Sequence, residues 1–159
     1  MRILKAVLPN AVVFLITVAV IWSGLEAYVS FYQDDGIQYY LEMWKYAREV
    51  KTVSVDPQIG HEHRPNASAH LMGVGITTNK QGYRDRDIEV EKAPGRIRIM
   101  MIGDSLTFGW GVPQDRTFPK VVEKRLNDGG IDAEVINTGV GNYNTVMEVG
   151  AFLKNGIKL

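Results

Sequence analysis

The sequence contains no cysteine among its 159 residues, which excludes disulfide bonds, thiolate-bound zinc, iron–sulfur clusters and a cysteine nucleophile. It also carries no excess of either charge, because 18 basic residues balance 18 acidic ones. A protein that binds nucleic acid usually has a basic surface, so we expect no nucleic-acid partner. The hydrophobic fraction of 45% is typical of a folded protein and argues against disorder.

Charge is missing altogether from residues 6–25. A helix of that length measures about 30 Å, which is the thickness of a bilayer's hydrocarbon core. The basic residues Arg2 and Lys5 precede this run, and Glu26 is the first charged residue after it. By the positive-inside rule we expect a single-pass anchor over residues 1–33, in the lipid bilayer of the cell inner membrane. Its N-terminus would be cytoplasmic and the rest of the chain periplasmic; a cleaved signal peptide is the alternative.

A juxtamembrane amphipathic helix is expected over residues 34–50, with Asp34 or Asp35 as its cap. One side of this helix forms an apolar stripe at helical spacing, consisting of Ile37, Tyr40, Leu41, Trp44 and Ala47. We expect the helix to pack on its own domain or to lie at the membrane surface. The alternative is that the stripe docks onto a partner protein in the membrane.

Residues 51–95 are punctuated by glycine and proline, which predicts a loop-rich connector with short strands. The run His61-Glu62-His63 is the one group in this connector that suggests a metal site. It lacks the i, i+4 spacing of helical zinc ligands and has no further ligands nearby. We therefore expect a solvated loop there, with no metal and no cofactor.

The remaining chain, residues 96–159, predicts an α/β domain. The expected elements are, in order, a buried parallel strand over residues 97–102, a helix capped by Thr117 and ended by Gly129, a second strand over residues 133–136, and a helix opened by a capping box at Thr145-Val146-Met147-Glu148. Two β-α units in series indicate a doubly wound sheet, which here is incomplete. Such sheets place ligands at the carboxyl ends of their strands.

The loop after the first of these strands contains Gly103-Asp104-Ser105-Leu106. A serine in this position, next to a glycine and leading into a helix, is well placed as a nucleophile, with backbone N–H groups near an oxyanion. The run resembles the first signature block of the SGNH (GDSL) hydrolase family, and residues 135–145 resemble the second block. Residues 64–68 and 78–84 are similar to the segment before the hydrolase core in membrane-anchored bacterial members.

This resemblance implies a flavodoxin-like sheet and a serine esterase or acyl hydrolase activity. Ser105 would attack the ester carbonyl, and its own backbone N–H would donate to the oxyanion. A second donor would come from the backbone N–H of Asn142, at a position where the family typically has glycine; Gly141 lies one place earlier. Asparagine tolerates the left-handed conformation that such a position requires.

The family's asparagine block and its Asp-x-x-His block do not occur between the second block and Leu159. The histidines of this chain all precede Ser105, which is the wrong order for the family. We therefore expect a non-catalytic accessory or structural subunit of a membrane assembly. Other membrane subunits would cover the exposed edge of strand 97–102; the alternative is that residues 51–95 cover it. The alternative is the N-terminal fragment of an active membrane-anchored serine esterase that acts on acylated glycan or lipid.

Overall fold

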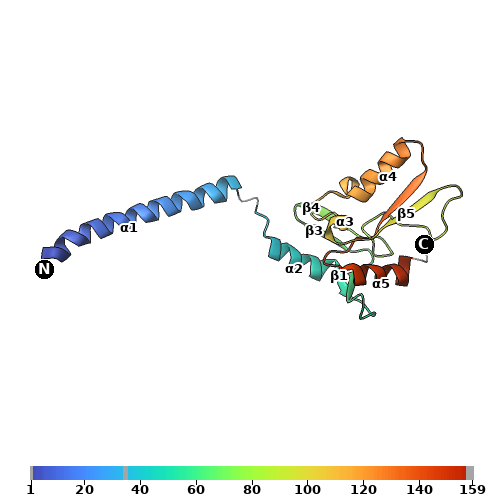
Figure 1. Ribbon diagram of the computed structural model, residues 1–159, viewed down its shortest axis with the longest axis horizontal. Helices are drawn as coiled ribbons and strands as arrows, with labels where there is room; N and C mark the ends of the chain where they lie inside the picture. The colour runs from blue at the N-terminus through green and yellow to red at the C-terminus, as the bar shows by residue number, and fades with distance from the viewer. Residues whose placement is uncertain (1, 34–35, 157–159) are drawn as a thin grey trace. The chain divides into compact units, whose positions relative to one another are not determined.

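The computed structural model describes residues 2–33 and 36–156 and divides into two compact units, residues 1–37 and residues 38–159 (Figure 1). The first unit contains helix α1 (Arg2–Tyr28) and the π-helical turn η1 (Val29–Gln33). The second unit mixes helices with small sheets. Its elements are α2 (Tyr39–Glu49), β1 (Lys51–Val53), β2 (His61–His63), β3 (Ser68–Leu71), β4 (Val74–Thr77), β5 (Ile97–Met101), α3 (Ser105–Phe108), η2 (Gln114–Arg116), α4 (Phe118–Asp128), β6 (Ala133–Asn137) and α5 (Thr145–Asn155).

Helix α1 and η1 present apolar side chains on all sides. Trp22 is 70% exposed and Phe31 is 82% exposed. The segment Leu8–Gln33 is long and apolar enough to cross a membrane, and none of it is buried inside the protein. A core helix would be mostly buried, so this helix is not part of the core. The chain therefore has one apolar N-terminal helix that could anchor it in a membrane, as expected, while its sidedness stays a prediction.

Helix α2 packs against other elements of the second unit, as one of the two expectations for this helix had it. Tyr46 and the residue that ends the helix, Val50, are fully buried, and α2 contacts β1 and β3. The expected caps, Asp34 and Asp35, lie outside the described residues. Gln38 stands at the N-cap position and makes no side-chain capping hydrogen bond. Tertiary packing, rather than a cap, therefore holds this helix in place.

The apolar stripe of α2 is not its packing face. Tyr40 is 88% exposed and Trp44 is 55% exposed. The packing face instead includes a carboxylate, because Glu42 is buried and accepts a hydrogen bond from Met72 N at 2.6 Å. The sequence pattern favoured the apolar side, but Tyr46 and Glu42 find buried partners on the other side. Tyr40 and Trp44 are therefore accessible to a surface outside the unit.

Residues 51–95 form two antiparallel hairpins, which confirms the expected short strands. Strand β1 pairs with β2, with Lys51 opposite His63, and β3 pairs with β4. The prediction of a solvated loop at residues 61–63 is wrong, because this run is strand β2 and His63 is only 5% exposed. Side chains alternate along a strand, so His61 and His63 share one face and Glu62 occupies the other.

The expected parallel pair of strands is present. Strand β5 pairs with β6, with Ile97 opposite Ala133 and Met101 opposite Asn137. All five residues of β6 are buried, and α4 packs against it. In Figure 1, α4 lies above this strand pair and α5 lies below it. The sheet has these two strands in the described part of the chain, so a doubly wound SGNH sheet stays a prediction.

The helix ends agree with the sequence at α4 and differ by one residue at α5. Thr117 and Gly129 stand at the cap positions of α4 as predicted, although the Thr117 hydroxyl donates to Gln114 O instead of capping. At α5 the predicted capping box is wrong. The N-cap is Asn144, whose side chain accepts a hydrogen bond from Met147 N at 3.1 Å. Asparagine is as strong an N-cap as serine, which explains the shift from Thr145.

Candidate functional site

Ser105 lies at the junction between β5 and the short helix α3, of which it is the first residue. Asp104 precedes the helix, and its carboxylate accepts a hydrogen bond from Leu106 N at 2.9 Å. This bond fixes the turn that presents Ser105. Ser105 is partly exposed, and nothing in the described chain forms a hydrogen bond with its hydroxyl. The hydroxyl is therefore available to a ligand.

The tight loop around Ser105 requires glycine at two positions. A Cβ at Gly103 would overlap the side chain of Thr107. Gly109, which ends α3, has a φ of 83°, and a Cβ there would overlap the Thr117 side chain. Both glycines let the backbone fold back closely behind the serine. The sequence predicted that glycine permits this tight turn, and these close contacts give the reason.

Arg84 holds the loop from behind, a role that the sequence analysis missed. This side chain is fully buried, and its guanidinium donates hydrogen bonds to three backbone carbonyls, those of Phe108 (2.9 Å), Gly109 (2.6 Å) and Val112 (2.6 Å). It also stacks on the Phe108 ring, at 5.0 Å from the centroid. Burial lowers the pKa of Arg84 to about 10. A guanidinium suits this position because its planar fork reaches several carbonyls at once.

The second loop, residues 137–144, lies directly against the first. Val140 N donates to Gly103 O at 3.0 Å, and a Cβ at Gly139 would overlap the backbone nitrogen of Phe108. Asn137 is fully buried and its side chain accepts a hydrogen bond from Gly139 N at 3.1 Å. The two loops that the sequence singled out are thus joined by backbone contacts at the carboxyl ends of β5 and β6.

Asn142 and Gly141 differ in their availability as oxyanion donors. Asn142 is exposed and has a φ of 68°, the left-handed conformation that a glycine would adopt freely. No acceptor for its backbone N–H is found within residues 36–156. The N–H of Gly141, in contrast, donates to the Tyr46 hydroxyl at 2.9 Å. Gly141 is therefore not a free donor here, and Asn142 is the remaining candidate beside Ser105.

The histidines of this chain are engaged elsewhere. His63 contacts Tyr46, His61 contacts Lys51, and His70 is exposed on β3. In the part of the chain that the structure describes, no imidazole or carboxylate bonds to the hydroxyl of Ser105. A serine hydroxyl without such a base is a poor nucleophile near neutral pH.

A buried polar cluster supports the second loop from the side of α2. The Tyr46 hydroxyl lies 2.6 Å from His63 Nε2, and His63 Nδ1 lies 3.1 Å from Gly82 O. Because a carbonyl only accepts, Nδ1 carries the proton and Nε2 accepts from the phenol. Burial lowers the pKa of His63 to about 3 and raises that of Tyr46, so both are neutral. The Gly141 amide completes this chain of hydrogen bonds.

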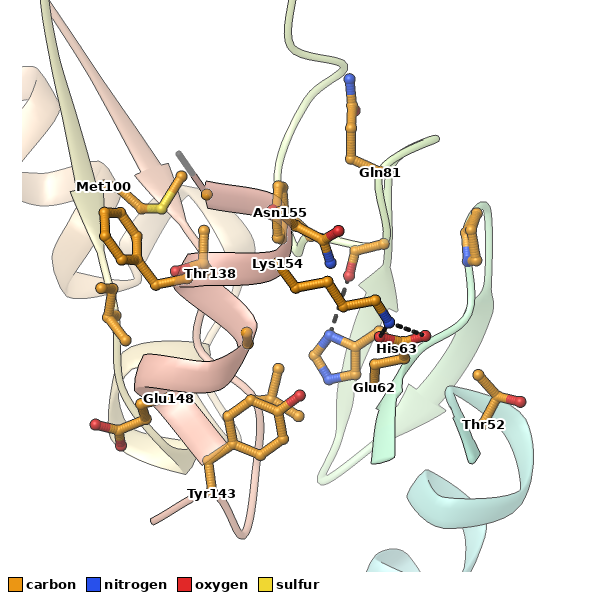
Figure 2. A pocket seen from close by; sticks show the side chains of 18 residues that line it. Thr52, Glu62, His63, Gln81, Met100, Thr138, Tyr143, Glu148, Lys154 and Asn155 are labelled. Carbon is orange, nitrogen blue, oxygen red and sulfur yellow. Dashed lines mark hydrogen bonds and ion pairs between the residues drawn. The ribbon is translucent and has the colours of Figure 1, made fainter. Parts of the chain in front are cut away.

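A cavity of about 260 Å³ lies between α5, β5, the β1–β2 hairpin and residues 81–83 (Figure 2). Its wall is apolar where Tyr143 and Phe152 contribute, and polar where Glu62 and Lys154 form an ion pair at 3.0 Å. The side-chain oxygen Oε1 of Gln81 is buried without a hydrogen-bond partner in the described structure. Ser105 does not line this cavity. This cavity is therefore separate from the candidate nucleophile.

The same cavity borders the free edge of β5. In a parallel pair, alternate residues bond to one neighbour, and Ile97 N and Met101 O bond toward β6. The backbone groups of Met100 therefore face the other edge, and Met100 lines the cavity together with residues 81–83. The connector thus borders this edge without pairing with it. Coverage by another subunit stays a prediction.

No group of three or more potential metal ligands is found in the described part of the chain. No protein-family model and no curated protein sequence matches this chain.

Proposed function

We propose that this chain is a membrane-anchored protein of the SGNH hydrolase type that holds an acyl ester at Ser105 without hydrolysing it. In this proposal it serves as a non-catalytic accessory subunit of a membrane assembly. The observation that carries the proposal is the Ser105 hydroxyl, which is presented at the start of α3 with no proton acceptor bonded to it.

Three features support an acyl-ester site. The serine follows a strand and begins a helix, so its own amide is one of the helix's N-terminal N–H groups that have no partner within the helix. Asn142 has the left-handed backbone expected of an oxyanion donor at this position, and its amide has no acceptor in the second unit as described. Arg84 fixes the loop through hydrogen bonds to three of its backbone carbonyls, and this pre-organises the site.

The absence of a bonded base among the described residues supports binding rather than turnover. In serine hydrolases, removing one member of the catalytic triad lowers kcat by roughly 10⁴-fold to 10⁶-fold. Binding and the oxyanion donors alone leave only a small residual rate. A site with the hydroxyl and the amides but no base would therefore bind and release an ester many times before hydrolysing it.

The proposal also places the chain in the inner membrane. Residues 8–33 could span the bilayer, and the basic residues Arg2 and Lys5 favour a cytoplasmic N-terminus. The second unit would then lie in the periplasm, beside other subunits of the assembly. The free edge of β5 is one surface through which such subunits could attach.

The test is the turnover of p-nitrophenyl acetate by the full chain in a neutral detergent. We expect the wild-type chain and Ser105→Ala to release p-nitrophenol at the same rate, because Ser105 takes no part in turnover. Ser68→Ala, which changes an exposed serine on β3, is the matched control. A rate that Ser105→Ala abolishes and Ser68→Ala preserves would overturn the non-catalytic proposal.

A second candidate function is part of an active serine esterase that acts on acylated glycan or lipid. The observation that favours it is the state of Ser105, whose hydroxyl is free while the loop behind it is tightly held. A base would then come from another chain or another segment. Hydrolysis that depends on Ser105 in native membranes, but not with the purified chain, would favour this candidate.

A further inference from the structure

A second, more open cavity of about 530 Å³ lies at the end of α2, next to the loop that carries Asn142. The residues that line it include Lys51, His61 and Arg64, which come from β1, β2 and the turn after β2. None of its described lining residues is aspartate or glutamate. Basic side chains from three segments therefore meet in one cavity without an acidic partner.

Lys51 carries a buried charge that the described protein does not neutralise. Its residue is only 8% exposed, and its ammonium donates to Gly141 O at 2.5 Å and to His61 Nε2 at 3.0 Å. It also lies 4.4 Å above the Tyr46 ring. None of these groups is an anion, and no carboxylate lies within ion-pair distance of Lys51 in the residues described. A buried charge in such surroundings is costly unless a counter-ion accompanies it.

The electrostatics agree with this geometry. Burial lowers the pKa of Lys51 to about 8, so the amine stays mostly protonated at pH 7. Burial, and to a smaller extent the charge of Lys51, lowers the pKa of His61. An anion in the cavity would oppose both effects, because it stabilises the charged forms.

Arg64 provides a second charge in the lining of the cavity. Its backbone N–H bonds to Val50 O at 2.8 Å, which fixes its position at the end of α2. The side chain is exposed, and no acceptor for its guanidinium is found in the described chain. A guanidinium binds phosphate and carboxylate oxygens in pairs, which suits an anionic headgroup.

The apolar stripe of α2 leads into this cavity. Ala47 lines the cavity, and Trp44 and Tyr40 precede it by one and two helical turns on the same side. Trp44 and Tyr40 are both exposed. Only residues 34–38 separate α2 from the candidate membrane span in the sequence. An anion site that continues into an exposed aromatic stripe matches a ligand with a charged head and an apolar tail.

We propose that this cavity binds the phosphate or carboxylate headgroup of an anionic lipid, whose acyl part lies along the Tyr40–Trp44 stripe. The headgroup oxygens accept hydrogen bonds from Arg64 and neutralise the charge of Lys51. The tail replaces water on the exposed aromatic rings. Ser105 does not line this cavity, although Asn142, whose amide is the proposed oxyanion donor, does.

The experiment uses the full chain in micelles of a neutral maltoside detergent, with binding measured by isothermal titration calorimetry. Three probes are compared: inorganic phosphate, dihexanoyl phosphatidylglycerol and the zwitterionic dihexanoyl phosphatidylcholine. We expect the phosphatidylglycerol to bind most tightly and the phosphatidylcholine to show no saturable binding. Ser105→Ala should bind like the wild type, so failure here is distinguishable from failure of the proposed function.

Two variants test the two halves of the site. Arg64→Gln should weaken phosphatidylglycerol binding about fivefold, as expected for one surface cation near an anionic lipid. Arg116→Gln, an exposed arginine on η2 outside the cavity, is the matched control and should change nothing. Tyr40→Ser should weaken phosphatidylglycerol binding by about threefold or more and leave phosphate binding unchanged. Both positions are exposed, so neither change threatens the fold.

Other results would overturn the proposal. Equal affinity for phosphate and for phosphatidylglycerol, with no effect of Tyr40→Ser, would assign the cavity to a soluble anion instead of a lipid. Equal weakening by Arg64→Gln and Arg116→Gln would mean that binding reflects net charge alone. No saturable binding of either anionic probe would remove the site.

Discussion

Replacing Arg84 by methionine should destabilise the second unit by about 3 kcal/mol. The guanidinium donates to three carbonyls. Gly109 O also accepts from Val112 N at 3.0 Å and Phe108 O from Asn137 Nδ2 at 3.4 Å, so Val112 O is the one that would lose its described donor. A hydrogen bond contributes about 1 kcal/mol net, so the loss of three gives about 3 kcal/mol.

Urea denaturation of the full chain in neutral detergent measures this effect. Trp110 is suited to report it, because its indole packs 5.1 Å from the Tyr46 ring and shares the buried cluster. Arg116→Met is the matched control, since that arginine is exposed, and should shift the free energy of unfolding by less than about 0.5 kcal/mol. A free energy of unfolding for Arg84→Met within about 0.5 kcal/mol of the wild type would show that the hydrogen bonds of Arg84 do not stabilise the loop.

Three other changes test separate parts of the structure. Gly139→Ala should prevent the two loops from meeting, because its Cβ would overlap the rigid backbone at Phe108. We expect the free energy of unfolding in urea to fall by about 3 kcal/mol or more, and a fall below about 1 kcal/mol would contradict the contact. Asn142→Ala should cost about 1 kcal/mol, because alanine tolerates a φ of 68° less well than asparagine does, whereas Asn142→Gly should be nearly neutral; equal effects of the two would argue against the left-handed conformation. The low pKa of His63 means that the unfolded state binds more protons below pH 6.5, so stability should fall by about 2 kcal/mol between pH 7 and pH 5. The same pH titration of His63→Gln should lose most of this dependence, and an unchanged slope would show that His63 is not its source.

Local patterns predicted the elements well where one physical signal dominated. The uncharged run at residues 6–25 predicted the apolar helix, and the apolar run at residues 97–102 predicted β5. Thr117 and Gly129 marked both ends of α4. In each case the signal lies within a few residues of the element that it specifies, so no tertiary contact was needed to interpret it.

The sequence did not predict the roles of residues that act through distant partners. The residues around His63 have the composition of a surface loop. His63 is nevertheless buried, because it forms hydrogen bonds with Tyr46 and Gly82, which are 17 and 19 residues away in the sequence. Arg84 and Lys51 are charged residues that can be buried because backbone carbonyls of remote loops accept hydrogen bonds from them. Hydropathy assigns such residues to the surface, and only the folded chain shows where their partners lie.

At the candidate site, too, local features were predicted from the sequence and long-range contacts were not. The motif around Ser105 identified the serine and its loop, and the backbone of Asn142 has the conformation that the motif required. The competing donor at Gly141 could be ruled out only from the hydrogen bond to Tyr46, which is 95 residues away in the sequence. A motif specifies the local backbone, whereas long-range hydrogen bonds decide which of its amides are free.

The most direct test of the account is the reaction of Ser105 with a fluorophosphonate probe, followed by mass spectrometry of the intact chain and its peptides. Such probes label serines that a base activates, so the account predicts that Ser105 of the purified full chain stays unlabelled under conditions that fully label a known serine hydrolase. Stoichiometric labelling at Ser105, absent from Ser105→Ala, would contradict the claim that this serine is presented without a proton acceptor.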